Sequence, residues 1–147
     1  MSKPVDLPFA ATLLVRDACL CLHVQRAARA LARRFDDGFR TLGLTSGQFS
    51  LLMSLNRAEP AGMGAVASLL AMDRTTLTAA LKPLERRGLV RVAVDAEDRR
   101  GRVLSLSPAG RALLARAFPV WTRTHAELER QLGVAPDELR RVLRELS

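Results

Sequence analysis

Apolar residues recur along the first third of the chain at alternating spacings of four and three, from about Thr12 to Leu42. A repeat with this spacing forms one stripe along a helix, and a stripe held over four turns packs against another helix. A second stripe runs beside the first, which predicts two packing partners, one of them a second subunit. Gly43 is the predicted helix end, and residues 1–11, with two prolines, are predicted to form an extended arm. The first stripe is Leu14, Ala18, Cys21, Gln25, Ala28, Ala32, Phe35, Phe39 and Leu42, and the second is Leu20, Val24, Ala27 and Leu31.

Three shorter helices are predicted in the middle of the chain. Thr45 and Gln48 have the spacing of a capping box, which predicts a helix that stops before Pro60. The segment AGMGAVASLLAMDRTTLTAALKPLERRGLV then has the pattern helix, tight turn, helix, with Asp73 as the N-cap of the second helix and Gly88 at its end. The predicted inward residues of that second helix are Leu77, Ala80, Leu81 and Leu84, and Pro83 is predicted to kink it.

A charged hairpin and two more helices complete the predicted elements. Val90, Val92 and Val94 alternate with polar or small residues, the polar loop Asp95–Gly101 follows, and residues 102–106 alternate again. Ser107 is the predicted N-cap of a long helix that Pro119 should bend, and Pro136 opens a short last helix. The stripe of the long helix is Leu114, Ala117, Trp121, Thr124 and Leu128. The predicted fold class is therefore mainly α with a small β-hairpin.

A two-helix unit with a tight turn, followed at once by a charged hairpin, is the winged helix-turn-helix pattern. Its second helix fits the major groove of double-stranded DNA, and an arginine at the tip of the wing can enter the narrower minor groove. Arg100 is the candidate for that insertion, with Asp98 positioned to accept from its guanidinium, while Arg99 and Arg102 are expected near phosphates. The candidates on the second helix are Arg74, Thr75, Thr76, Thr78 and Lys82.

The charge of the chain favours a polyanionic partner. Lys and Arg number 23 against 15 Asp and Glu, which gives a net charge of +8 and a pI near 11.2. Either nucleic acid or an anionic membrane surface fits that charge, but a membrane surface would need a basic amphipathic helix. The cations are instead spread through the helix-turn-helix and the hairpin, which favours DNA. No apolar run approaches the ~20 residues of a membrane span, and the N-terminal segment is a poor secretory signal, so a cytoplasmic location is expected.

The segments LGLTSGQFSLL, MDRTTLTAALKPLERRGLV and DAEDRRGRVLSLSPAGRALL carry a more specific signature. Through them the chain, from Leu13 to its C-terminus, resembles the MarR family of bacterial transcriptional regulators, with Asp98 and Arg100 matching the wing pair of that family. The resemblance implies a homodimer held by interlocked helices over residues 12–43 and 107–147, a DNA-binding lobe over residues 44–106, and a pseudopalindromic operator. Two departures are Ala79, where members often carry Arg, and Pro83 within the recognition helix.

Cys19 and Cys21 are candidates for a redox signal. Two residues apart on one helix, they would project about 200° from each other and could not pair without unfolding it. The run LCLHVQRAARAL resembles the first helix of the organic-hydroperoxide-sensing branch of the family, which implies that Cys21 forms a sulfenic acid and then a mixed or intersubunit disulfide. That branch supports its thiol with Tyr hydroxyls, whereas this chain has no Tyr, so His23, Arg26 or a helix dipole would have to activate it. Plain core packing is the alternative for both cysteines.

A small organic effector is the other expected signal. The resemblance implies a small, often aromatic, acid bound between the dimerisation and DNA-binding parts, and the candidate lining residues are His23, Arg26, Phe49, Met53 and Trp121. No catalytic residues, cofactor or metal site are predicted, because the sequence holds no Ser–His–Asp set, phosphate loop or metal cluster. Two alternatives are a winged-helix protein-interaction module, which the retained wing arginines disfavour, and a thiol peroxidase built on Cys21.

Overall fold

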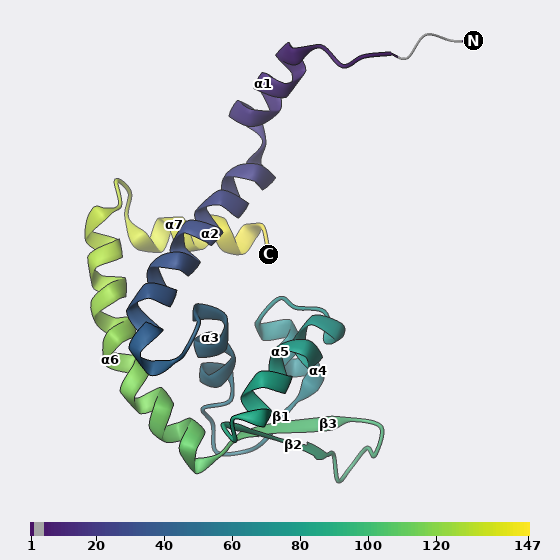
Figure 1. The fold of residues 1–147 in the computed structure, drawn as a ribbon, viewed down its shortest axis with the longest axis vertical. Helices are drawn as coiled ribbons and strands as arrows, with labels where there is room; N and C mark the ends of the chain where they lie inside the picture. The colour runs from purple at the N-terminus through teal and green to yellow at the C-terminus, as the bar shows by residue number, and fades with distance from the viewer. Residues whose placement is uncertain (2–4) are drawn as a thin grey trace.

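The structure is a computed structural model that describes residue 1 and residues 5–147. Its helices are α1 (Phe9–Ala18), α2 (Leu20–Phe39), the short 3-10 helix η1 (Arg40–Leu42), α3 (Ser46–Ser54), α4 (Met63–Leu69), α5 (Arg74–Arg86), α6 (Pro108–Gln131) and α7 (Pro136–Glu145), and its strands are β1 (Ala61–Gly62), β2 (Val90–Val94) and β3 (Arg102–Leu106). Two layers result, with α3 to β3 forming a lobe at the lower right of Figure 1 and α2, α6 and α7 forming its helical flank. Among the described residues, no helix is both long and apolar enough to cross a membrane.

The predicted long first helix is interrupted. Cys19 has an extended backbone (φ −72°, ψ 110°) and separates α1 from α2, so the prediction of one continuous helix to Gly43 was wrong. The apolar stripe continues across the break, and spacing alone therefore gave no sign of it. Helix α1 begins at Phe9, inside the predicted extended arm, whereas the Pro4 part of that arm lies outside the described residues. At the other end, Gly43 terminates η1 with a left-handed φ of 66°, as predicted.

The core of the lobe forms where the predicted inward faces meet. Its largest fully buried side chains are Phe39, Leu51, Leu52, Leu55, Val66, Leu77, Leu84 and Leu104. The capping box of Thr45 and Gln48 is confirmed, and so is the cap that Asp73 makes on α5. Helix α5 continues through Pro83 to Arg86, so the proline does not end it.

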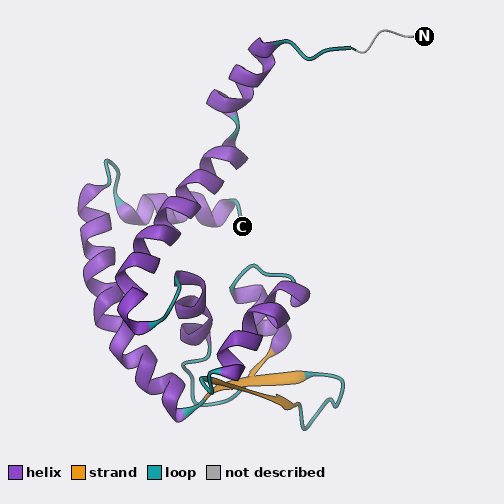
Figure 2. Ribbon diagram, viewed as in Figure 1, coloured by secondary structure: helices purple, strands orange, loops and turns teal. Residues whose placement is uncertain are grey.

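The predicted hairpin is confirmed as part of a three-stranded antiparallel sheet with the order β1-β3-β2. Val90 pairs with Leu106 and Val94 with Arg102, which leaves residues 95–101 as the tip (Figure 2). Strand β1, which places Ala61 opposite Leu104, has only two residues and no alternating pattern, and the sequence did not predict it.

A compact junction joins the lobe to α6. Ser107, which is 6% exposed, donates a hydrogen bond from its hydroxyl to the Gly88 carbonyl and accepts one from the Gly110 N–H at 3.0 Å. The Ser107 N–H also donates to the Leu89 carbonyl at 3.0 Å. A Cβ atom on Gly110 would lie 2.1 Å from that same carbonyl oxygen. The Ser-Pro-x-Gly motif therefore lets the end of α5, the start of β2 and the start of α6 meet at backbone distance.

Helices α2 and α6 cross beside the lobe, and α7 folds back on α6. A Cβ atom on Gly38 would lie 3.2 Å from Thr124 Oγ1, so the crossing is tight at that point. An ion pair between Arg140 and Glu129 holds α7 to α6. Much apolar surface stays uncovered in the single chain: no residue of α1 or α7 is buried, and Leu14 and Leu20 are 67% and 72% exposed.

Candidate nucleic-acid interface

Helix α5 presents one apolar face to the core and one polar face to solvent. Its N-terminus is fixed by Asp73, whose Oδ1 accepts from the Thr76 N–H at 2.7 Å and whose Oδ2 accepts from the Thr76 hydroxyl at 3.0 Å. Both bonds hold the pKa of the Asp73 carboxyl below its ordinary value, and the bond from the Thr76 backbone N–H has the larger effect. The outward face of α5, opposite the buried leucines, consists of Thr75, Ala79, Lys82 and Arg86, all exposed.

The three threonines predicted to contact DNA differ in what their hydroxyl groups already bind. The Thr76 hydroxyl donates to Asp73, and the Thr78 hydroxyl donates to the Arg74 carbonyl at 2.8 Å. Both are thus part of the helix, and only their acceptor lone pairs remain available. Within the described part of the chain, Thr75 makes no such side-chain hydrogen bond, which leaves its hydroxyl free to donate outward.

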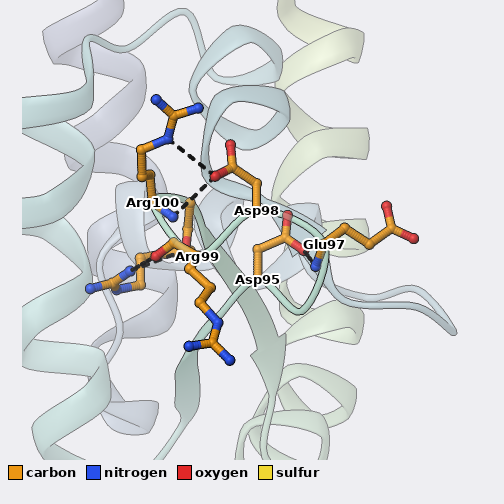
Figure 3. Close-up of polar contacts among 7 residues, drawn as sticks. Asp95, Glu97, Asp98, Arg99 and Arg100 are labelled. Atoms are coloured by element: carbon orange, nitrogen blue, oxygen red, sulfur yellow. Dashed lines mark hydrogen bonds and ion pairs between the residues drawn. The ribbon is translucent and has the colours of Figure 1, made fainter.

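The wing tip is a turn organised by two aspartates (Figure 3). Asp95 Oδ1 accepts from the Glu97 N–H at 2.9 Å, and Asp98 Oδ1 accepts from the Arg100 N–H at 3.1 Å. The Arg100 Nε also donates to Asp98 Oδ1, at 3.4 Å, while the Arg100 side chain stays 93% exposed. An exposed pair of that length contributes little stability. Asp98 therefore acts mainly by shaping the turn and directing the guanidinium, and Glu97 points away from both.

A groove of about 350 Å³ lies between the start of α5 and the wing. It brings together Arg74 and Thr78 from α5 with Asp98, Arg100 and Arg102 from the hairpin, which were predicted as one interface. Three guanidinium groups line it against the carboxylates of Asp95 and Asp98, so its balance is cationic. Thr75 and Lys82 lie outside this groove on the outward face of α5, and Arg99 lines a separate hollow with Val94 and Ala96.

Three of the five predicted effector residues meet in one apolar cavity. Phe49, Met53 and Trp121 line a space of about 330 Å³ between α3, α4 and α6. His23 and Arg26 do not line this cavity, and the α2 side chain that stacks on Phe49 is Phe39, at the other end of the helix. The cavity residues that the sequence reasoning missed are Ser50, Ser54, Leu69, Leu70 and Phe118.

The aromatic wall of this cavity continues into a stack. Trp121 lies between Phe118 and His125, with ring centroids 5.9 Å and 4.7 Å away. A neighbouring cavity of about 510 Å³ shares Met53 and Phe118 and adds the polar side chains of Asn56 and Arg111. Phe118 stands off the predicted stripe of the long helix, and no feature of the sequence identified it as a lining residue.

The two cysteines occupy different environments at the break between α1 and α2. Cys19 is half-buried and outside the helix, where its Sγ accepts from the Leu22 N–H at 3.5 Å. The prediction that both thiols project from one helix was therefore wrong, and the argument against their pairing does not apply. Cys21 is exposed, and its Sγ lies 3.3 Å from Gln25 Nε2. His23 contacts the Cys19 carbonyl through Nδ1 at 2.7 Å, and the described residues contain no cluster of three or more metal-ligating side chains.

Comparisons with known proteins agree with this geometry. A family model described as MarR family matches residues 44–101. The HTH-type transcriptional regulator TtmR of Methylorubrum extorquens (strain PA1) is 36% identical over 97 residues, which are 66% of this chain and about half, 50%, of that protein's length. The M. tuberculosis transcriptional regulator MOSR, in complex with DNA, superposes with a TM-score of 0.81 at 37% identity over 87% of this chain and 92% of that one. The transcriptional repressor CouR, bound to a 23-mer DNA duplex, superposes with a TM-score of 0.73 at 29% identity over 97% of this chain and 96% of that one.

Proposed function

The chain belongs to the MarR family of transcriptional regulators, and from that premise we propose that it is a homodimeric repressor that binds a pseudopalindromic operator. The observation that carries the proposal is the cationic groove between α5 and the wing, where Arg74, Arg100 and Arg102 converge. The DNA in the MOSR and CouR structures supports double-stranded DNA as the partner. Sequence-specific binding then needs α5 in the major groove and the wing beside it.

Each part of the interface has a physical task in this arrangement. The outward face of α5 meets base edges, while the positive end of the helix, next to Arg74, favours a phosphate. Arg100, almost fully exposed at the wing tip, enters the minor groove, where the negative potential is greatest. Asp98 directs Arg100, and Arg99 and Arg102 lie near the phosphates on either side of the hairpin.

The dimer is proposed from the apolar surface that the single chain leaves uncovered. Helix α1 buries none of its residues, and Leu20, Val24 and Leu31 of the second α2 stripe are 72%, 40% and 38% exposed. At the other end of the chain, Leu146, the C-cap residue of α7, is 61% exposed. Apolar areas of this extent are uncommon on monomers. Residues 12–43 and 107–147 thus form the proposed dimerisation part, and residues 44–106 the DNA-binding lobe.

Two signals can release the proposed repressor. The first proposed signal is a small organic acid whose apolar part would enter the cavity of Phe49, Met53, Phe118 and Trp121. The cavity lies between α6 and the helix-turn-helix, so its occupation would move one against the other. Oxidation of Cys21 is the second signal, because that thiol is exposed. His23 is engaged with a backbone carbonyl and does not contact the Cys21 thiol. The cavity is therefore the input that the geometry favours.

The other candidate functions receive less support. A winged-helix module without DNA binding would not need the three arginines of the groove. The MarR family and the similar structures are transcriptional regulators, which are not enzymes, and Cys21 contacts Gln25 rather than a cation that would stabilise a thiolate.

Fluorescence anisotropy on DNA from upstream of the protein's own gene tests the proposal. We expect salt-sensitive binding by the reduced protein and a loss of about 1–3 kcal/mol in Arg100→Ala, as for an arginine in a groove contact. Glu97→Ala is the matched control, since Glu97 lies on the same tip and points away from Arg100 (Figure 3). Equal affinity of Arg100→Ala and the wild type would refute the role of the wing. Absence of specific binding to any duplex would refute the function itself.

A further inference from the structure

The outward face of α5 carries a methyl group at its centre. Ala79 lies four residues after Thr75 and three before Lys82, so the three side chains form one stripe on the helix. All three are exposed, and the stripe lies opposite the face on which Leu77, Leu81 and Leu84 are buried. Ala79 thus lies on the side of α5 that faces away from the core, and its side chain is exposed.

Few polar groups near Ala79 are free to bind the same base that its methyl group would contact. The hydroxyls of Thr76 and Thr78 donate within the helix, and Arg74 lies toward the wing, in the groove. Of the short side chains on the first turns, Thr75 alone can donate outward. A helix with this face in the major groove places Thr75 and Lys82 against base edges on either side of an apolar methyl.

We propose that Ala79 contacts the C5-methyl group of a thymine, and so makes thymine the preferred base at one position of each operator half-site. Thymine is the only base that presents a methyl group on the floor of the major groove, and alanine is among the side chains that contact it. The Ala79 side chain has no hydrogen-bond donor or acceptor, so it can distinguish bases only by apolar contact. The inference rests on the proposed function, because it requires α5 to enter the major groove.

Deoxyuridine substitution tests the contact, since it removes the thymine methyl and keeps the base pair. The probe is a duplex that the wild-type protein enriches from a randomised 30-base-pair pool, with each thymine of one half-site replaced in turn by deoxyuridine. We expect the wild type to bind one substituted duplex about fourfold more weakly, the ratio that corresponds to one buried methyl group. Ala79→Ser, which replaces the methyl by a hydroxymethyl group on an exposed helix, should bind that duplex and its thymine parent equally.

Controls separate this inference from the stability of α5 and from the proposed function. Ala79→Gly should lose the discrimination as Ala79→Ser does, whereas Glu85→Gly, at an exposed position of α5 outside that outward face, should keep it. The inference is overturned if the wild type is insensitive to every deoxyuridine, if the enriched half-site holds no thymine, or if Ala79→Ser keeps the same fourfold difference. In each of those cases the enriched duplex still binds, so the proposed function stands. If the protein enriches no duplex from the pool, the proposed function fails instead.

Discussion

Replacing Gly110 by alanine should destabilise the protein, although alanine is the better helix former. Gly110 lies in the first turn of α6, where its Cα faces the Leu89 carbonyl. The added Cβ would lie 2.1 Å from that oxygen and 3.0 Å from its carbon. Ordinary carbon–oxygen contacts are about 3.3 Å or longer, so the two backbone segments would have to separate by about 1 Å.

The magnitude follows from what that separation breaks. The Leu89 carbonyl also accepts the Ser107 N–H at 3.0 Å, and Ser107 Oγ accepts the Gly110 N–H at the same distance. Overpacking costs about 1–3 kcal/mol, and weakening these bonds costs about 1 kcal/mol each. The higher helix propensity of alanine, compared with glycine, offsets about 1 kcal/mol of this cost. A net loss of about 2–4 kcal/mol lowers the midpoint of thermal unfolding by about 6–13 °C in a chain of this size.

Thermal unfolding followed by circular dichroism, at one protein concentration, measures this loss. Gly47→Ala is the matched control, because Gly47 also lies in the first turn of a helix and the nearest atom to its added Cβ is Thr45 Oγ1 at 4.0 Å. Gly47→Ala should keep or raise the midpoint. A Gly110→Ala protein as stable as the wild type would show that the junction yields without cost and would refute the reasoning.

Three further predictions concern the α5 cap, the cavity and the thiols. Hydrogen bonds from Thr76 lower the folded-state pKa of Asp73 from its ordinary 3.8, so the cap stabilises the fold above that pH and its contribution is lost as the pH falls through the lower value. The midpoint of thermal unfolding should therefore fall less between pH 7 and pH 3 in Asp73→Asn, which keeps a capping oxygen, than in the wild type. Equal falls in the two proteins would contradict this. Trp121 is the only tryptophan, so a benzoate-type acid that enters the cavity should change the intrinsic fluorescence and lower operator affinity in parallel, whereas release without a fluorescence change would place the site elsewhere. If the thiol signal operates, an organic peroxide should release the wild type but not Cys21→Ser, and release of both proteins would exclude Cys21.

Local patterns were sufficient for most elements of the lobe. Thr45, Asp73 and Ser107 each stand where a side-chain oxygen caps a helix, and these caps depend only on residues three positions away. The wing pair of Asp98 and Arg100 is equally local, and its hydrogen bonds have the predicted partners. The break at Cys19 could not be predicted in this way, because the apolar spacing is the same on both sides of it.

Contacts between distant segments depended on the tertiary structure. The sequence indicated that Phe49, Met53 and Trp121 could line a cavity, but only the crossing of α3, α4 and α6 adds Phe118 and leaves out His23 and Arg26. It indicated a Ser-Pro-x-Gly helix start, but only the fold shows why no Cβ fits at the glycine.

The sequence by itself determined the winged helix-turn-helix pattern, the charge and the candidate DNA contacts, because each arises from residues within one helix or one turn. The tertiary structure decided which side chains share the apolar cavity, that Phe118 is one of them, and that the Leu89 carbonyl leaves no room for a Cβ at Gly110. These depend on how the elements are oriented toward one another and toward solvent, which the burial of the shared core fixes and the spacing within any single element does not.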